Sequence, residues 1–310
     1  MKKLLVVGVT CADVIINVDH LPKTAEDVVV YGQEMTLGGC AFNAFWVARS
    51  LGADVDLFSP IGRGVYADFV RAELEREGLK SIAPLSEGQD GCCYCFVEPG
   101  GERTFVAYHG AEYLYEDTWL QGLDMDGYDG VYVCGLEVEE RTGPVLVDFL
   151  ERSCRAKTVY FTPGPRPHAI PADLLGRILS LSPVLHMNDS EVMVMARGAG
   201  GNPTGWRDAA RYLCERTGAP VIVTRGPAGS VALTPGEEVV APGAPAVVVD
   251  TIGAGDSHIG AVMAALSQGQ GMFEALSCAN RVAARVCATA GAHVAKSVLL
   301  RAARGCASCG

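Results

Sequence analysis

The sequence is most informative at Asp250-Thr251-Ile252-Gly253-Ala254-Gly255-Asp256-Ser257. This stretch follows the β-branched run Val247–Val249 and opens an apolar segment that reaches Leu266, a pattern that predicts a strand, a glycine turn and a helix. That order brings backbone N–H groups and the positive end of a helix dipole to one concave point, which suits a phosphate group. Asp256 lies in the same turn, where a carboxylate is placed to accept the proton of a hydroxyl group. The alternative is an ordinary turn in which Asp256 or Ser257 only caps the helix.

Neither standard sequence pattern for phosphate binding fits this chain. No G-x-x-x-x-G-K stretch is followed by Ser or Thr, so the sequence has no Walker loop. Gly253, Gly255 and Gly260 lack the spacing of a dinucleotide fingerprint, and no such fingerprint occurs early in the chain. A Rossmann-type dehydrogenase therefore explains only the alternation of strands and helices.

Four further motifs precede this stretch. They are Gly8 to Asp13, Gly38-Gly39-Cys40-Ala41-Phe42-Asn43 with Leu51-Gly52-Ala53 behind it, Asn188-Asp189-Ser190-Glu191, and Thr224-Arg225-Gly226-Pro227-Ala228-Gly229. Together with the stretch at Asp250–Asp256, the ordered set resembles the PfkB, or ribokinase-like, family of carbohydrate and nucleoside kinases. The resemblance spans nearly the whole chain. It departs from ribokinases at Cys40-Ala41, where they usually carry Lys and Gly.

Strand-like and helix-like stretches alternate along the chain, which favours parallel β-α units with helices on both faces of a sheet. The predicted strands are Leu4–Val9, Val55–Ser59, Gly130–Val133, Thr158–Phe161, Val184–Met187, Val221–Thr224 and Ser230–Leu233. The predicted helices include Ala41–Leu51, Tyr66–Glu77, Gly143–Ser153, Ala209–Arg216, Asp256–Leu266 and Met272–Ala288. The resemblance implies the same α/β class, a ribokinase-like three-layer sandwich with a mostly parallel central sheet.

Two segments, approximately residues 14–33 and 91–108, interrupt this alternation. In the second, two apolar runs flank Glu98-Pro99-Gly100-Gly101-Glu102, which predicts a β-hairpin. From the residues alone, these segments would form an antiparallel appendage. The resemblance implies a small β-sheet lid over the substrate, through which two copies of the chain sometimes pair. Val28-Val29-Val30-Tyr31 would supply an exposed apolar edge for such a homodimer.

Composition predicts one domain that spans residues 1–310. Hydrophobic residues make up 49% of the 310 residues, charged residues make up 20%, and no Pro/Ser-rich or charged linker divides the chain. A formal net charge of -11 without a Lys/Arg stripe argues against nucleic acid as a partner. No apolar run approaches the ~20 residues that span a bilayer, and the N-terminal run lacks a cleavage site of the signal-peptide type. We therefore expect a cytoplasmic protein without a membrane partner.

The 12 cysteines are dispersed through strand-like and helix-like segments, which favours small core residues with free thiols. Cys306 and Cys309 form a single C-x-x-C pair near the end of the sequence. Zinc usually takes four ligands, so one pair is a weak signal for a metal or redox site.

Phosphoryl transfer requires an aligned hydroxyl group, a base beside it, and neutralisation of charge around the γ-phosphate. Asp256 is the predicted base. The backbone amides of Gly253, Ala254 and Gly255 form the predicted anion hole. The resemblance implies ATP as the phosphoryl donor.

By the same resemblance, Asn188 and Glu191 hold Mg²⁺ through its water shell. From the residues alone, Asn188 would end a strand and Glu191 would lie in the first turn of a helix. The resemblance also assigns nucleotide binding to a set of residues late in the chain. They are Asn188, Thr224, Gly226, Gly229 and Asn280.

Substrate recognition is expected at the carboxyl ends of parallel strands. By resemblance, Asp13, Gly39 and Asn43 hold sugar hydroxyls, and Glu137 occupies the place of a ribose-binding glutamate. A carboxylate and an amide suit a polyol because they accept and donate hydrogen bonds to adjacent hydroxyls. Arg103, in the predicted lid hairpin, would reach an anionic group of the substrate. The alternatives are a helix cap at Asp13, a buried amide at Asn43, a solvated acid at Glu137 and an exposed arginine at Arg103.

Two further expectations concern the stretch around Asp256. Asp250 and Ile252 would help to bind a monovalent cation such as K⁺, as in ribokinases. His258 follows where an aromatic residue is common in the family, and we expect it to pack one turn into the helix rather than bind a ligand.

The predicted function is that of an ATP-dependent phosphotransferase that phosphorylates a primary alcohol of a sugar or ribonucleoside, with ribose or a ribosyl group favoured. Fructose-type sugars and 2-keto-3-deoxy sugar acids are the alternatives within the family. A non-catalytic sugar or nucleotide sensor on the same fold is the alternative from another class. Retention of Asp256 argues against a sensor, which gains nothing from an acid beside a phosphate.

Overall fold

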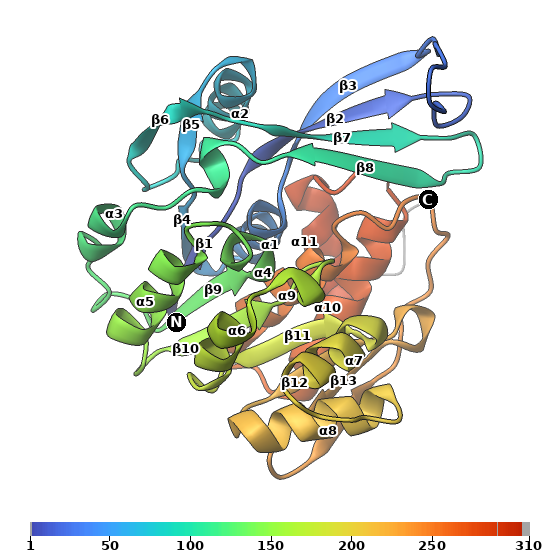
Figure 1. Cartoon of the computed structure of the whole chain (residues 1–310). Helices are drawn as coiled ribbons and strands as arrows, with labels where there is room; N and C mark the ends of the chain where they lie inside the picture. Colours follow the sequence, from blue (N-terminus) through green and yellow to red (C-terminus); the bar gives the residue numbers. More distant parts are fainter. Residues whose placement is uncertain (1, 290, 306–310) are drawn as a thin grey trace.

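A twisted sheet forms the middle layer of the molecule (Figure 1). The computed structural model describes residues 2–289 and 291–305, and within them this sheet has eight strands in the order β14-β13-β12-β11-β10-β9-β1-β4. The strands from β4 to β12 run parallel, and β13 and β14 are antiparallel to their neighbours. Their bounds are β1 Lys3–Val7, β4 Asp54–Phe58, β9 Gly130–Cys134, β10 Thr158–Thr162, β11 Val184–Asn188, β12 Val221–Thr224, β13 Ser230–Leu233 and β14 Glu238–Ala241.

Both faces of the main sheet are buried, which explains why its strands are continuous apolar runs rather than alternating ones. In β1, Leu4 and Val6 enter the core on one face, whereas Leu5 and Val7 enter the core on the other. Each face is covered by a layer of helices, so the predicted α/β three-layer arrangement is present.

One helical layer contains α1 Cys40–Ser50, α2 Val65–Arg76, α9 Ala254–Ser267, α10 Met272–Cys287 and α11 Lys296–Arg304. The other layer contains α3 Asp117–Gln121, α5 Gly143–Ser153, α6 Ala172–Leu179, α7 Asp189–Gly198 and α8 Trp206–Thr217. The short helix α4, Gly135–Val138, directly follows β9. In the first layer α1 packs against α9, and a side chain at Gly260 would collide with the Ala44 carbonyl, so the glycine permits the two helices to lie close.

A second sheet projects from one end of the molecule, at the top of Figure 1. Its strands are β2 Cys11–Asn17, β3 Gly32–Gly38, β7 Cys92–Val97 and β8 Arg103–Tyr108, in the order β3-β2-β7-β8. The predicted hairpin is therefore present as β7 and β8. The first segment, expected at residues 14–33, extends from Cys11 to Gly38. A smaller parallel pair, β5 Ile61–Arg63 and β6 Leu85–Gln89, lies near the base of this sheet.

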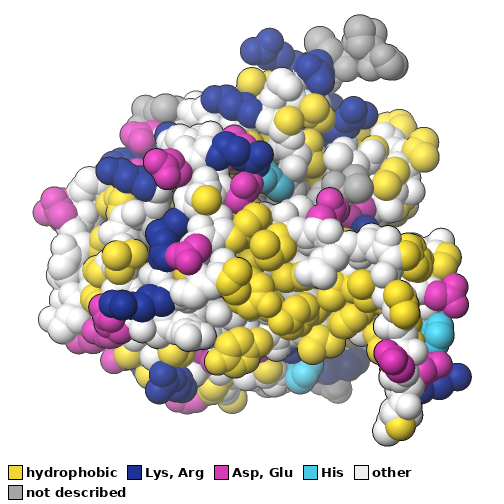
Figure 2. Space-filling view, turned by 90° about the horizontal axis from the view of Figure 1, so that it is seen from above, with side chains coloured by type: hydrophobic (Ala, Val, Ile, Leu, Met, Phe, Trp, Pro, Cys, Tyr) yellow, Lys and Arg dark blue, Asp and Glu magenta, His cyan; other side chains and the backbone are white. Residues whose placement is uncertain are grey.

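The two faces of the small sheet differ. The cross-strand pairs Asp13 with Cys93 and Cys95 with Phe105 place one set of side chains on the face that carries Asp13. On the opposite face, Tyr94 bonds to Tyr66 of α2 at 2.9 Å, whereas Val106 remains exposed. Figure 2, which views the molecule from above, shows hydrophobic side chains gathered into one patch on this side of the molecule.

The prediction of a strand at Val247–Val249 is wrong, whereas the apolar stretch Val28–Tyr31 is largely exposed as expected but lies outside a strand. Val247–Val249 forms no strand, and its side chains are 82%, 63% and 57% exposed. Instead of joining the main sheet, the Val249 N–H donates to the Cys287 carbonyl at the end of α10, at 2.7 Å. The edge strand is β14, which precedes Pro242 and was not predicted. Val28–Tyr31 likewise lies in an exposed connection rather than on a strand edge.

The cysteines that the structure describes are all free. Six are buried and four are half-buried, in keeping with a packing role. Cys306 and Cys309 lie outside the described residues. None of the described helices combines the length and the hydropathy that a membrane span requires.

The exposure of Val248 leads to a stability prediction. Val248→Ala removes little buried surface and should change the free energy of unfolding by less than about 0.5 kcal/mol. Val223→Ala, the same change inside β12, should destabilise the protein by about 2 kcal/mol because Val223 is fully buried. Urea denaturation of both variants would measure the two effects. Similar losses at the two positions would contradict the placement of Val248 outside the core.

Candidate active site

The centre of the site is a hydrogen bond between two helices. Helix α9 begins at Ala254, two residues earlier than predicted, and Gly253 precedes it with a φ of 69°, a conformation that favours glycine. The Asn43 side chain on α1 donates from Nδ2 to Asp256 Oδ2 at 3.0 Å. The motifs that contain Asn43 and Asp256 therefore meet in one place although 213 positions separate these residues.

Asp256 has an environment suited to a base. Burial raises the pKa of its carboxyl to about 6, and hydrogen bonds from Asn43 and the Cys40 thiol limit the rise. A pKa near but below 7 leaves the carboxylate largely ionised at neutral pH while it can still accept a proton. Sequence reasoning did not assign a role to Cys40, whose thiol is close to Asp256 because it opens the same helix as Asn43.

The first turn of α9 presents free amides beside Asp256. The Ala254 N–H donates to the Thr251 carbonyl at 3.3 Å, whereas the N–H groups of Gly255 and Asp256 donate to no backbone carbonyl of a described residue. A side chain at Gly255 would meet nothing within 4 Å, so the space beside this residue is open. These donors lie at the positive end of a fourteen-residue helix, which is the geometry of an anion site.

Asp13 approaches the same point from the small sheet. Its carboxylate lies against Gly38, where any side chain would collide with it. Burial raises the pKa of Asp13 to about 7, a bond from the Cys11 thiol lowers it in part, and the nearby charge of Asp256 raises it further. Gly39, with a φ of 102°, then turns the chain into α1. Asp13, Gly39 and Asn43 therefore lie on consecutive pieces of one wall.

Glu137 on α4 is buried rather than solvated. The Val9 N–H donates to its Oε1 at 2.8 Å, while Oε2 has no partner among the described residues. Burial raises the pKa of Glu137 to about 8, against the lowering effect of its backbone hydrogen bonds. Asn43 Oδ1 is also buried without a described partner. Buried polar oxygens without partners are costly, so each of these two atoms has hydrogen-bonding capacity that the described residues leave unused.

Asn188 and Thr224 are neighbours in the main sheet. They are paired residues at the ends of the parallel strands β11 and β12. The Asn188 side chain accepts hydrogen bonds from the N–H groups of Ser190 and Glu191, and Glu191 Oε2 accepts from the Asn188 N–H at 2.8 Å, which forms a capping box at the start of α7. Burial raises the pKa of Glu191, and the charge of Asp256 contributes to the rise. Glu191 is thus close enough to Asp256 to interact with it electrostatically.

The glycine turn after β12 lies beside the same edge of the sheet. Gly226 opens a single 3₁₀ turn, Gly226–Ala228, and Gly229 follows it; their φ values are 52° and 89°. A side chain at Gly229 would collide with the Ala241 carbonyl and with Gly243. Glycine is therefore required where the turn packs against the connection that follows β14.

Asn280 and His258 belong to a buried chain of hydrogen bonds. The Asn280 Nδ2 group donates to the carbonyls of Ala241 and Pro242, at 3.1 and 3.0 Å, which directs its Oδ1 toward His258 Nε2 at 3.1 Å. His258 Nε2 must then carry a proton, so Nδ1 accepts from His186 Nε2 at 2.9 Å. His258 therefore packs inside α9 as predicted. Asn280 supports the connection after β14 rather than exposing its amide.

Arg103 contacts the glycine stretch rather than an open pocket. From the start of β8 its Nη2 lies 2.7 Å from Asp250 Oδ2, and the two side chains are 18% and 0% exposed. The same Oδ2 accepts from the Gly291 N–H at 2.7 Å, and Oδ1 accepts from the Ile252 N–H at 3.0 Å. Asp250, which the family resemblance assigns to a monovalent cation together with Ile252, is thus already paired with a protein cation.

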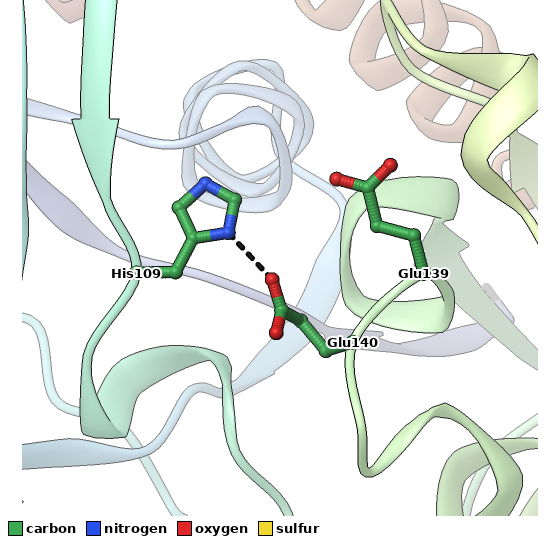
Figure 3. A group of neighbouring side chains, drawn as sticks. All are labelled: His109, Glu139 and Glu140. Atoms are coloured by element: carbon green, nitrogen blue, oxygen red, sulfur yellow. Dashed lines mark hydrogen bonds and ion pairs between the residues drawn. The ribbon is translucent and has the colours of Figure 1, made fainter.

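Sequence reasoning missed a charged cluster beside α4. Figure 3 shows Glu140 directed at His109, with Nδ1 and Oε1 at 2.5 Å, and Glu139 facing the pair from the end of the helix. Three such side chains can in principle ligate a metal. Arg166, however, already forms an ion pair with Glu139. We therefore assign the cluster to ion pairing, which no spacing in the sequence would have revealed.

Comparison with known proteins agrees with this geometry. The family model described as pfkB family carbohydrate kinase matches residues 1–297. The chain belongs to the PfkB family of carbohydrate kinases. Within it, the uncharacterized sugar kinase YegV of Escherichia coli strain K12 is 33% identical to this chain over 285 residues, which cover 92% of this chain and 88% of the relative.

Solved structures show the same fold. Ribokinase from Thermotoga maritima superposes with a TM-score of 0.85 at 22% identity, covering 98% of this chain and 100% of the other. Ribokinase from Cryptococcus neoformans in complex with ADP superposes with a TM-score of 0.78 at 20% identity, covering 98% and 99%. The predicted PfkB family and ribokinase-like fold are confirmed, and a Rossmann-type dehydrogenase is excluded. The roles of individual residues remain predictions.

The buried histidine chain predicts a pH dependence of stability. Burial lowers the pKa of His258 to about 4, so as the pH falls below about 6.5 the unfolded state takes up the proton first and the folded state loses stability. In His258→Gln this loss is removed. The variant should be less stable than the parent at pH 7.5. The difference between their free energies of unfolding should be smaller by about 2 kcal/mol at pH 5. Urea denaturation at the two pH values measures it.

His168→Gln is the matched control because His168 is exposed. Its stability should follow that of the parent at both pH values. A gap between parent and His258→Gln that is equal at pH 7.5 and pH 5 would contradict the assignment of a neutral, buried His258.

Proposed function

We propose that this chain transfers the γ-phosphoryl group of ATP to a primary alcohol of a sugar or of the ribosyl group of a nucleoside. The observation that carries the proposal is the Asn43–Asp256 hydrogen bond beside the open amides of Gly255 and Asp256. The proposed base and the proposed anion site belong to the first turn of α9, and Asn43, the amide proposed to bind hydroxyl groups, contacts the base from α1. Family membership in the carbohydrate kinases supports the same reaction class.

In the proposed reaction, the substrate oxygen forms a bond to the γ-phosphorus as the bond from that phosphorus to the bridging oxygen of ADP breaks. Asp256 accepts the hydroxyl proton. The amides of Gly255 and Asp256 would stabilise the negative charge that develops on the phosphoryl oxygens, and they need no reorganisation because the helix fixes them. The predicted amide of Ala254 is already bonded to the Thr251 carbonyl.

The charges of the crevice favour a divalent cation with the nucleotide. Burial raises the pKa values of Asp13, Glu137, Glu191 and Asp256, and the charge of Asp256 adds to the rise at the other three, so these carboxyl groups share one region. Such a region repels the phosphates of free ATP. Mg²⁺ would neutralise the phosphates when bound, and Asn188 and Glu191 are the residues that would hold it through water, with Glu191 supplying the charge.

The nucleotide is proposed to lie along the ends of β11 and β12. Asn188 and Thr224 are adjacent there, and the glycine turn at Gly226 and Gly229 leaves the approach free of side chains. Asn280 would act on the base indirectly, because it holds the connection at Pro242. The ADP complex of the Cryptococcus neoformans ribokinase supports ADP and ATP as the nucleotides.

Ribose or a ribonucleoside is the favoured substrate class. The unpartnered oxygens of Glu137 and Asn43 suit adjacent hydroxyls of a polyol, and Asp13 adds a third polar group on the same wall. A fructose-type sugar would satisfy the same groups. The pairing of Arg103 with Asp250 removes the reason for assigning it to the carboxylate of a 2-keto-3-deoxy sugar acid.

A non-catalytic sensor on the same fold would have no use for the Asp256 environment. Asp256→Asn keeps the shape and the contact with Asn43 but cannot accept a proton. It should lower kcat at least about 100-fold and leave nucleotide affinity within a few-fold. ADP release from MgATP would be measured with ribose, ribonucleosides, fructose, fructose phosphates and 2-keto-3-deoxy sugar acids.

Turnover on one substrate class that is lost in Asp256→Asn would identify that class. Asp189→Asn changes an exposed acid at the start of α7, so it is a matched control and should retain activity. Equal turnover in the parent and in Asp256→Asn would remove the proposed mechanism. Nucleotide binding without turnover on any substrate would favour the sensor.

We further propose that two copies pair through the outer face of the small sheet. Met35, Val106 and Tyr108 expose apolar surface there, on strands that project from the body. Val106→Asp should convert a dimer to a monomer in size-exclusion chromatography with light scattering. Val240→Asp, a similarly exposed valine on β14, should leave the dimer intact. A monomeric parent protein would contradict this proposal.

A further inference from the structure

Asp250 is a fully buried carboxylate at the entrance to the glycine stretch. It ties this stretch to the end of α10, because its side chain accepts from Ile252 and Gly291 and its own N–H donates to the Cys287 carbonyl at 3.0 Å. These bonds fix the path of the backbone directly before the anion site. An acid is therefore useful here because its two oxygens accept hydrogen bonds from two backbone N–H groups at once.

The charge of that acid is unfavourable for the proposed function. A buried negative charge without a partner is costly to the fold. It would also oppose a phosphate bound at the amides of Gly255 and Asp256, because the interaction of like charges is strong where water is excluded. The site therefore needs a positive charge at Asp250.

Arg103 supplies that charge from the small sheet. In the part of the chain that the structure describes, it is the only basic side chain within 4.0 Å of the Asp250 carboxylate. Its other terminal nitrogen, Nη1, lies 3.6 Å from Cys95 Sγ on the neighbouring strand, which holds the guanidinium in position. The pair joins positions that are far apart in the sequence, one at the start of β8 and the other in the connection before α9.

We propose that Arg103 is a positioning residue that replaces the monovalent cation of ribokinases with a cation attached to the protein. This inference rests on the proposed kinase function. The carboxylate oxygens that a K⁺ ion would use are engaged by Arg103, Gly291 and Ile252, so the Asp250 side chain does not fit a K⁺ site. The enzyme is consequently indifferent to K⁺, and the anion site is complete only while the small sheet lies over the glycine stretch.

The first test compares activity with MgATP in KCl and in tetramethylammonium chloride of equal ionic strength. The rates of the parent enzyme in the two salts should lie within about twofold of each other, because the oxygens of Asp250 are already engaged by protein donors. Arg103→Met keeps much of the side-chain length and removes the charge. Its kcat/KM in tetramethylammonium should fall about 10- to 100-fold, and KCl should recover most of the loss.

Two further variants separate charge from packing. Arg103→Lys retains a cation and should remain indifferent to K⁺, although with lower activity because the fork geometry is lost. Arg103→Met combined with Asp250→Asn removes both charges, so its response to K⁺ should disappear. Arg63→Met is the matched control, because Arg63 pairs with Glu87 at the surface, and it should behave as the parent does.

A second readout does not depend on turnover. The Tm of Arg103→Met in tetramethylammonium should lie at least about 5 °C below that of the parent, and KCl should raise it, whereas the parent Tm should be the same in both salts. If the parent phosphorylates none of the substrates tested, the kinase proposal fails. The Tm measurement still decides whether Arg103 takes the place of a monovalent cation.

Three results would overturn the inference. The first is strong activation of the parent by K⁺. The second is an Arg103→Met variant with parental activity and Tm in the absence of K⁺. The third is an impaired Arg103→Met variant in which neither activity nor Tm responds to K⁺, which would confine Arg103 to packing the small sheet.

Discussion

The bond between Asn43 and Asp256 is the constraint around which the site is built. It requires α1 and α9 to begin side by side, and the close packing of these helices at Ala44 and Gly260 makes that possible. Once the two N-terminal turns are adjacent, the wall that carries Asp13 and Gly39 and the amides of Gly255 and Asp256 face the same space. The main sheet then brings Asn188 and Thr224 to the same end, because β11 and β12 are parallel neighbours.

Burial also makes the ionised forms of several acids in the site unfavourable. Carboxyl groups at Asp13, Glu137 and Asp256 have pKa values that burial raises to about 7, 8 and 6. Each group is costly when ionised and would be relieved by a hydroxyl donor, a cation or a proton. The one acid of the glycine stretch that has a basic partner is Asp250, which pairs with Arg103 of the small sheet. Acids that would meet ligands thus remain without a cation, and the acid with a structural role has one.

The motifs allowed much of this arrangement to be predicted from the sequence. Alternating apolar stretches gave the layers of helices around the sheet, and the motifs at Asn43 and Asp256 located the centre of the site. The local sequence pattern wrongly predicted a strand at Val247–Val249. These β-branched residues follow two prolines, and Val249 bonds to the end of a helix instead of a strand. A strand depends on an available neighbour, and β14 already occupied the edge of the sheet.

Side-chain partners could not be predicted in the same way. Arg103 lies on a strand of the small sheet and Asp250 lies in a connection of the main body, while His186 reaches His258 from β11. Such pairs are decided by tertiary packing, for which one sequence gives no direct signal. The acid at Glu137 was placed correctly after β9, but only the structure shows that it is buried and that one of its oxygens has no described partner.

The separation of Asn43 from Asp256 has a consequence for how the protein is made. Residues 43 and 256 come from opposite parts of the chain, so a ribosome has synthesised most of the polypeptide before the second partner exists. Until α9 has been synthesised, the crevice beside Asn43 and the small sheet is incomplete. Apolar surface that α9 later covers is then exposed and can form other contacts. Competence for ligand binding should therefore arise in one late step of biosynthesis rather than accumulate as successive units fold.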